Sequence, residues 1–407
     1  MMHSSPAAAP TPEPAFKNGQ SGFEPFDYAP RTRVIFGPDS VGRVGQLVKE
    51  LGPKRILLVT DAGIVAAGHA RRVKLALEEA GLSVATFEEV QENPSSNCVN
   101  KCVALARKEG IDCIVGLGGG SSMDTAKGCN FVLTNGGRMK DYWGIGKATK
   151  PMLPLVAIPT TGGTGSECQS FALITDEETH QKMACGDPKA AARVAILDPI
   201  LTVSQPPRVT ACTGIDAIAH AVETAVTRKR TTLSMLYSRG AFRLLTAGFP
   251  RVLKSPEDLE ARGLMLLGAA WAGTAIENSM LGAAHSAANP LTAHFDVVHG
   301  KAVGLVLPHV VRFNAAEPVA AAAYTELAVS AGLCSVGESS ANASAKLADF
   351  LQSLLPLAGL PETLSTCEIG PKDFPMLAEE AAKQWTAQFN PRSVGTDDFI
   401  KIYQSAS

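Results

Sequence analysis

The stretch Ile111-Asp-Cys-Ile-Val-Gly-Leu-Gly-Gly-Gly-Ser-Ser-Met-Asp-Thr-Ala-Lys127 decides the fold of the first half of the chain. Its apolar beginning is typical of a buried strand, and the glycines after it lead into a helix. Glycines let the backbone approach a phosphate closely, and the free N–H groups of a helix N-terminus favour anions. We expect Ser121 or Ser122 to cap this helix. The spacing matches neither Gly-x-Gly-x-x-Gly nor the Walker A loop, so a plain strand-to-helix turn is the alternative.

Apolar runs and amphipathic runs alternate on both sides of this stretch. We expect strands at residues 32–36, 55–61, 82–87 and 155–159, and helices at about 67–80 and 98–108. Asp39 or Ser40 is expected to cap a helix after the first strand. Strands and helices that alternate at this interval predict a parallel sheet covered on both faces, which the strand at 155–159 closes.

A second loop of small residues, Pro159-Thr-Thr-Gly-Gly-Thr-Gly-Ser-Glu167, also follows a predicted strand. Because open α/β sheets bind ligands at the carboxyl ends of their strands, we expect the two loops to contact one ligand. Two unrelated turns are the alternative. Asp61 ends an earlier strand, where a carboxylate accepts hydrogen bonds from a ribose and repels a 2′-phosphate, so it favours NAD over NADP. Asp61 could equally cap the turn that follows it.

One aspartate and three histidines form a candidate metal site in the second half of the chain. Asp216 and His220 stand four residues apart, so on a helix both side chains leave the same face. His285 and His299 flank a later segment. A carboxylate and three imidazoles can complete the shell of a divalent metal. For each histidine alone, a hydrogen-bonded core or surface position is the alternative.

Length and periodicity predict two domains. A chain of 407 residues is too long for one ordinary core. Strand signals nearly vanish after Pro206-Pro207, where helical periodicity rich in Ala and Leu begins. We expect a disordered tail over residues 1–25, a dinucleotide-binding α/β domain over 26–206 and an all-helical metal-binding domain over 207–407.

Charge and cysteine usage exclude several classes of partner. A net charge of −2 predicts neither a nucleic-acid nor a membrane partner. The longest apolar run, residues 263–276, is too short to span a membrane and predicts a buried helix. The nine cysteines contain no Cys-x-x-Cys pair, and Cys98 and Cys102 fit one helix face. This usage favours free thiols in a reducing compartment, so we expect a cytoplasmic protein.

Together these segments resemble the iron-containing (group III) alcohol dehydrogenase family. Four motifs occur in family order: Gly-Gly-Gly-Ser-x-x-Asp-x-x-Lys, Pro-Thr-Thr-x-Gly-Thr-x-Ser-Glu, Gly-x-Asp-Ala-x-x-His-Ala-x-Glu and His-Gly-x-x-x-x-x-x-Leu-Pro-His. The match runs from about Thr32 to Asn390-Pro-Arg. The resemblance implies an N-terminal Rossmann-like domain, a C-terminal helical domain, and a cleft between them that holds nicotinamide and metal.

The resemblance also assigns individual residues. The metal ligands of the family fall on Asp216, His220, His285 and His299, and its pyrophosphate contacts on Gly119, Gly120 and Ser121, with Asp124 in the following turn. Thr160, Thr161 and Thr164 match the second cofactor loop, Asp61 and Asn93 match adenosine-side positions, and Lys182 matches a lysine that reaches the nicotinamide ribose. Leu173 and Leu201 match apolar wall positions.

The chain departs from the family pattern at Asn289. Many members carry a second histidine there, four residues after the one at 285, which is suspected of relaying the alcohol proton. An amide cannot titrate near neutral pH, so we expect Asn289 to orient a water or a substrate hydroxyl. His294 could substitute for the missing histidine, although a surface or structural role is more common for such a residue.

The resemblance implies that a hydride passes between NAD(H) and a small alcohol or aldehyde, with the metal as Lewis acid. Fe(II) is the family expectation, and Zn(II) also binds shells of this kind. We expect a homo-oligomer, a dimer or larger. A 3-dehydroquinate synthase-like lyase that uses NAD and metal, and a catalytically inactive NAD- and metal-binding protein, are the alternative functions.

Overall fold

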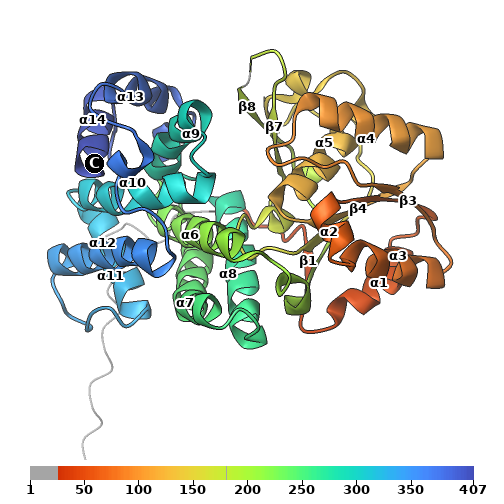
Figure 1. Cartoon of the computed structure of the whole chain (residues 1–407), viewed down its shortest axis with the longest axis horizontal. Helices are drawn as coiled ribbons and strands as arrows, with labels where there is room; N and C mark the ends of the chain where they lie inside the picture. The colour runs from red at the N-terminus through yellow and green to blue at the C-terminus, as the bar shows by residue number, and fades with distance from the viewer. Residues whose placement is uncertain (1–25, 180) are drawn as a thin grey trace, which may run out of the picture.

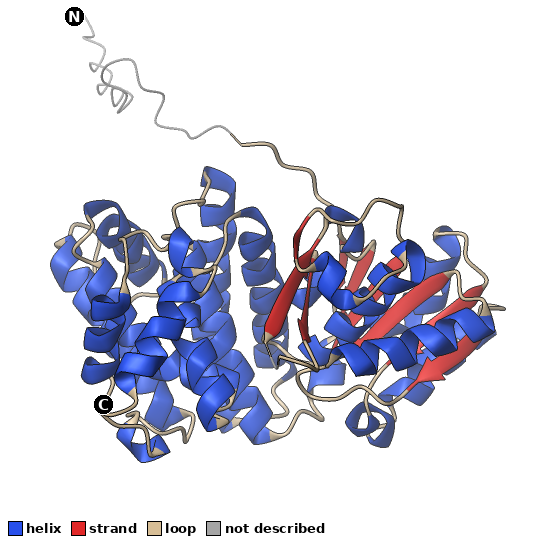
Figure 2. Ribbon diagram, turned by 90° about the horizontal axis from the view of Figure 1, so that it is seen from above, coloured by secondary structure: helices blue, strands red, loops and turns tan. Residues whose placement is uncertain are grey.

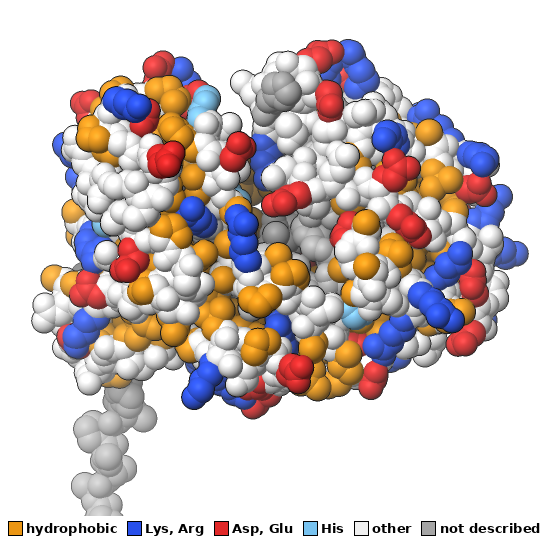
Figure 3. Space-filling view, in the orientation of Figure 1, with side chains coloured by type: hydrophobic (Ala, Val, Ile, Leu, Met, Phe, Trp, Pro, Cys, Tyr) orange, Lys and Arg blue, Asp and Glu red, His pale blue; other side chains and the backbone are white. Residues whose placement is uncertain are grey.

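The computed structural model describes residues 26–179 and 181–407, so the tail expected over residues 1–25 lies outside the described residues. An α/β part and an all-helical part lie side by side (Figures 1 and 2). The surface facing the viewer in Figure 3 is hollowed between them, and charges of both signs are spread over this face. The predicted fold class, a parallel-sheet α/β domain followed by a helical domain, is confirmed.

A six-stranded parallel sheet forms the first part, with strand order β1-β9-β6-β4-β2-β3. The strands are β1 (Arg33–Phe36), β2 (Arg55–Val59), β3 (Ser83–Phe87), β4 (Cys113–Gly118), β6 (Leu155–Pro159) and β9 (Val194–Leu197). Alternate residues of β2 pack into different cores: Ile56 and Leu58 under α1 (Val44–Glu50) and α3 (His69–Glu79), and Leu57 and Val59 under α4 (Ser96–Glu109) and α5 (Gly120–Asn135). The sheet is therefore covered on both faces, as predicted.

Two features of the sheets differ from the prediction. Strand β6 does not close the main sheet, because β9 pairs with it and brings β1 to the edge. A second sheet, of β5 (Gly144–Ile145), β7 (Phe171–Thr175) and β8 (Lys182–Gly186), was not predicted. Both misses involve strands of two to five residues, which are too short to show a clear period.

The local caps predicted for the helices after β1 and β4 were wrong. Asp39 adopts a left-handed conformation with φ 59° and does not cap the 3₁₀ helix η1 (Ser40–Arg43). The carboxylate of Asp198 accepts hydrogen bonds there instead, from the backbone N–H groups of Asp39 and Val41, at 3.2 Å each. Helix α5 begins after Gly119, and neither Ser121 nor Ser122 caps it. Its first turn therefore keeps backbone N–H groups without a side-chain cap.

Nine helices of the described chain build the second part. They are α6 (Pro207–Thr224), α7 (Thr232–Lys254), α8 (Leu259–Asn278), α9 (Ala283–Phe295), α10 (His299–Asn314), α11 (Pro318–Ser330), α12 (Ser340–Leu357), α13 (Phe374–Lys383) and α14 (Thr396–Ser405). The apolar run at 263–276 lies inside α8, where most of its side chains are buried, as predicted. Of the helices described, none has the length and apolarity needed to cross a bilayer.

The two parts join through a close backbone contact. After β6, the chain passes Gly165, at φ 62°, against Gly273 of α8. A side chain at Gly273 would overlap the carbonyl group of Gly165. Glycine is therefore required where the second small-residue loop rests on the helical part.

Candidate metal and dinucleotide site

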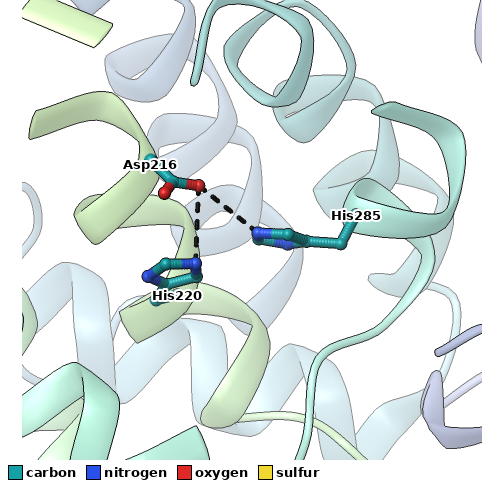
Figure 4. A group of neighbouring side chains, drawn as sticks. All are labelled: Asp216, His220 and His285. Carbon is teal, nitrogen blue, oxygen red and sulfur yellow. Dashed lines mark ion pairs between the residues drawn. The ribbon is translucent and has the colours of Figure 1, made fainter. Parts of the chain in front are cut away.

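Helices α6 and α9 bring Asp216, His220 and His285 together in the helical part (Figure 4). Asp216 and His220 lie one turn apart on α6, as their spacing predicts, and Asp216 Oδ1 is 3.4 Å from His220 Nε2. His285 comes from α9, and its Nε2 is also 3.4 Å from Asp216 Oδ1. The rings of His220 and His285 stack with their centroids 4.9 Å apart. All three side chains are buried.

The carboxylate oxygen and imidazole nitrogens of this cluster are suitable ligands for a divalent metal. Among the described residues, 26–179 and 181–407, no group forms a hydrogen bond with the buried atoms Asp216 Oδ1 and His285 Nε2, which is costly for polar atoms. Ligand atoms around a tetrahedral metal at about 2.0–2.1 Å are roughly 3.4 Å apart, which agrees with the observed separations. The residues present could therefore hold a metal ion with one oxygen and two nitrogen ligands.

His299, the first residue of α10, lies at the more open side of the cluster. Its Nε2 is 3.7 Å from Asp216 Oδ1, and its side chain is 29 % exposed. The centroid of its ring is 5.3 Å from that of His285. The structure thus brings three of the four predicted ligands into tight contact and places the fourth beside them.

The charges of the cluster are strongly coupled. Burial alone would raise the pKa of Asp216, but the three imidazoles hold it well below its usual range. Burial would lower the pKa of His285, but the carboxylates of Glu223 and Asp216 outweigh this effect and raise it to about 9. Burial lowers the pKa of His220 and His299. A metal at this site would therefore replace a proton on His285.

The glycine loop and the second small-residue loop lie against each other. The backbone N–H of Thr160 donates to the Gly118 carbonyl oxygen at 2.9 Å. A Cβ atom on Gly120 would lie 2.8 Å from the Thr164 methyl group, and one on Gly119 would lie 3.4 Å from that of Thr161. The loops therefore form one surface at the carboxyl ends of β4 and β6, as predicted, and are not unrelated turns.

A buried lysine that was not predicted as a site residue fixes the second loop. Lys127 Nζ donates to the backbone oxygen of Ser166 at 2.5 Å, to its hydroxyl at 2.8 Å and to the Phe171 carbonyl at 2.9 Å. The Ser166 hydroxyl in turn donates to Asp124 at 3.1 Å. Lys127 is the last residue of the glycine-loop motif, and this position is the sequence feature that could have identified it as a site residue.

Asp61 caps the turn that follows it, which is one of the two roles considered for it, and its contact with a ribose stays a prediction. Its Oδ1 caps α2 (Ala62–Ala66) by accepting from the N–H of Ile64 at 3.0 Å. Its Oδ2 accepts from the Ser122 hydroxyl at 3.4 Å, which places the carboxylate beside the glycine loop. Ser121 stands in the first turn of α5.

The other predicted cofactor residues differ in their surroundings. Lys182 Nζ donates to Asn93 Oδ1 at 3.3 Å, so these two predicted residues lie side by side. Leu173 of β7 is 37 % exposed and available as a wall residue. Leu201 is fully buried in the core between the sheet and helices α1 and α3. It has no free surface, so the structure gives no support to its predicted place in the pocket wall.

Asn289 lies one turn after His285 on α9. Its amide donates to Gln384 Oε1 at 3.0 Å, so a partner from the end of α13 holds it. His294 forms a partly exposed pair with Glu380 at 2.8 Å and has the surface role considered for it. The sequence did not indicate Gln384, because nothing local connects it to α9.

Comparison with known proteins agrees with this geometry. A sequence model described as "Iron-containing alcohol dehydrogenase" matches residues 30–199, and one described as "Fe-containing alcohol dehydrogenase family, C-terminal" matches residues 210–407. The chain belongs to the iron-containing alcohol dehydrogenase family. Membership in this family favours an oxidoreductase over the lyase considered above.

Relatives within the iron-containing alcohol dehydrogenase family match almost the whole chain. An NAD-dependent methanol dehydrogenase of Bacillus methanolicus is 35% identical over 91% of this chain and 97% of its own length. A 1,3-propanediol dehydrogenase of Klebsiella pneumoniae is 34% identical over 94% of this chain and 98% of its own length. The crystal structure of a 1,3-propanediol oxidoreductase, 33% identical, superposes with a TM-score of 0.91 over 94% of this chain and 100% of that one.

A substitution at Gly300, next to His299, tests whether α10 must lie this close to α6. A Cβ atom there would overlap the backbone oxygen of Cys212, which cannot rotate away. We expect Gly300→Ala to destabilise the protein by about 1–3 kcal/mol and to displace His299 from Asp216, which weakens zinc binding. Denaturant unfolding and zinc competition with a chelator measure the two effects.

Gly304→Ala is the matched control, one turn further along α10. A Cβ atom there meets only the side-chain ends of Ile215 and Leu355, at 2.8 and 2.9 Å. It should lower stability but leave zinc affinity unchanged. Wild-type zinc affinity in Gly300→Ala would show that the position of His299 does not depend on this contact.

Proposed function

We propose that the chain is an NAD(H)-dependent alcohol dehydrogenase or aldehyde reductase with one divalent metal. Residues 26–206 would form the dinucleotide-binding domain and residues 207–407 the metal-binding domain. The observation that carries this proposal is the buried cluster of Asp216, His220 and His285, with two ligand atoms that have no partner. Family membership supports Fe(II) as the metal, and Zn(II) suits the same ligands.

Residues of both domains would hold the reactants. The glycine loop, with Gly119, Gly120 and Ser121, and the loop bearing Thr160, Thr161 and Thr164 would bind the pyrophosphate. Lys182, whose Nζ donates to Asn93 Oδ1 at 3.3 Å, would bind the nicotinamide ribose. Lys182 lies near enough to His299 for its charge to help lower the pKa of that ring, which supports a nicotinamide end beside the metal ligands.

A hydride would pass between the carbon of the alcohol or aldehyde and the nicotinamide ring. When bound, the metal would supply Lewis-acid polarisation of the substrate oxygen. Relatives are named for methanol and 1,3-propanediol, which supports a small primary alcohol as the substrate. The name of the former relative supports NAD.

Absorbance in the NADH band tests the reaction directly. After loading with Fe(II) or Zn(II), the protein should reduce NAD⁺ with at least one member of a panel of small primary alcohols and diols. His285→Ala and Asp216→Ala should lose both metal content and activity, because each removes a ligand. His294→Ala is the control, since it removes a histidine from a partly exposed pair.

Two outcomes would contradict this function. Wild-type metal content in both ligand variants, by elemental analysis, would overturn the metal assignment. A metal-loaded protein that binds NADH but turns over no alcohol or aldehyde would instead favour the inactive NAD- and metal-binding alternative.

We further propose that Asp61 makes NAD(H) the preferred cofactor, because its carboxylate would repel a 2′-phosphate. The repulsion should be worth on the order of 1–3 kcal/mol, roughly a tenfold to hundredfold difference in affinity. Asp61→Asn keeps an oxygen to cap Ile64 but removes the charge, so it should narrow the preference. Asp39→Asn removes an exposed charge elsewhere and should leave the preference for NAD(H) over NADP(H) unchanged. Equal use of both cofactors by the wild type would exclude this role.

For Asn289 we propose an orienting role. Its amide nitrogen is held by Gln384, which leaves Oδ1 to accept from a substrate hydroxyl or a water. Asn289→Ala should raise KM more than it lowers kcat, because binding is lost but not proton transfer. Steady-state kinetics would contradict this if kcat fell by the roughly 10²–10⁴-fold typical of a lost general base while KM stayed constant.

A homo-oligomer is proposed as well. Strand β1 lies at a sheet edge, and Val34 and Phe36 on it are 43 % and 47 % exposed, as expected of a strand that pairs with another chain. Light scattering should then give a mass above the 42.5 kDa of one chain. The cytoplasmic location stays a prediction.

A further inference from the structure

We propose that Glu223 is a positioning residue that fixes the tautomer and the orientation of the His285 ring toward the metal. This inference rests on the proposed metal function. Glu223 lies on α6, three residues after His220, and only 3 % of its surface is exposed. Glu223 takes no part in the contact between His220 and Asp216.

Both carboxylate oxygens of Glu223 are used on α9. Oε2 contacts Nδ1 of the His285 ring, and Oε1 accepts from the backbone N–H of Ala284 at 2.7 Å. The other ring nitrogen, Nε2, lies 3.4 Å from Asp216 Oδ1. The imidazole of His285 is thus held between two carboxylates, one on each side.

This contact selects the tautomer of His285. An ionised carboxylate can only accept hydrogen bonds, so Nδ1 must carry the hydrogen and Nε2 keeps its lone pair for the metal. Carboxylates commonly orient metal-bound histidines in this way, and their removal typically costs about 10–100-fold in metal affinity. A glutamine at 223 has one acceptor oxygen for two N–H groups. If its NH₂ group faced Nδ1, the ring hydrogen would move to Nε2 and block the metal.

Helix α9 has a second distant cap, which supplies a matched control. Its own N-cap residue, Gly282, makes no side-chain cap. Instead Asn390 Oδ1 accepts from the N–H of Ala283 at 3.2 Å, next to the N–H that Glu223 accepts. Asn390→Ala therefore removes a cap from the same helix turn but leaves the partner of His285 in place.

The experiment compares zinc affinity, by competition with a chelator, and thermal unfolding of the metal-free proteins. Glu223→Gln should bind zinc about 10–100-fold more weakly than the wild type. Asn390→Ala should unfold at a lower temperature with zinc affinity close to that of the wild type. Glu223→Asp keeps a pure acceptor and should bind zinc more tightly than Glu223→Gln. If Glu223→Gln does not fold, Glu223→Asp is compared with Asn390→Ala instead. Glu223→Asp should then bind zinc more weakly than Asn390→Ala.

¹⁵N NMR of the His285 ring, recorded on the metal-free proteins at a pH above 9, where this ring is neutral, gives a readout that a purely structural role would not change. The wild type should show the hydrogen on Nδ1, and Glu223→Gln should lose this tautomer preference. Zinc affinity of Glu223→Gln equal to that of the wild type, or equal losses of affinity in Glu223→Gln and Asn390→Ala, would overturn the proposal. A wild type that binds no zinc would instead refute the metal function itself.

Discussion

The burial of the Asp216 carboxylate is the constraint on which the rest of the helical part depends. A buried carboxylate costs several kcal/mol unless cations or donors surround it. Here the surrounding groups are three imidazoles from three different helices, so the charge can be tolerated only when α6, α9 and α10 are all in place. The same requirement makes the cluster a metal site, because the atoms that compensate the carboxylate are themselves ligands.

Close packing of backbones makes this convergence possible. Helices that carry ordinary side chains at their contacts lie about 8–10 Å apart, whereas glycine lets them approach more closely. Gly300 of α10 rests on the backbone of α6, and Gly273 of α8 rests on that of the loop at Gly165. The first contact sets the position of His299 beside Asp216. The second attaches the second small-residue loop to the helical part.

Local patterns were sufficient to predict the strands and helices that alternate at regular intervals, and also the pairing of Asp216 with His220. Both depend on spacing within one element, which the sequence shows directly. The wrong cap after β1 has a clear physical origin: a side chain distant in the sequence replaced the local one. Asp198 caps the helix that Asp39 was expected to cap. Tertiary packing also buries Leu201 beside the sheet and brings Gln384 to Asn289, and no local pattern indicates either contact.

The glycine loop and the second small-residue loop are held in place by the protein's own buried charges, chiefly by Lys127. A fully buried ammonium group must be hydrogen-bonded, and its three hydrogen bonds go to Ser166 on the second loop and to Phe171 at the start of β7. Asp124 holds the same serine from the glycine-loop side. The conformation of the second loop is therefore determined by the desolvation of Lys127. A ligand that binds to a loop held in this way does not have to order it, so more of its interaction energy remains as affinity.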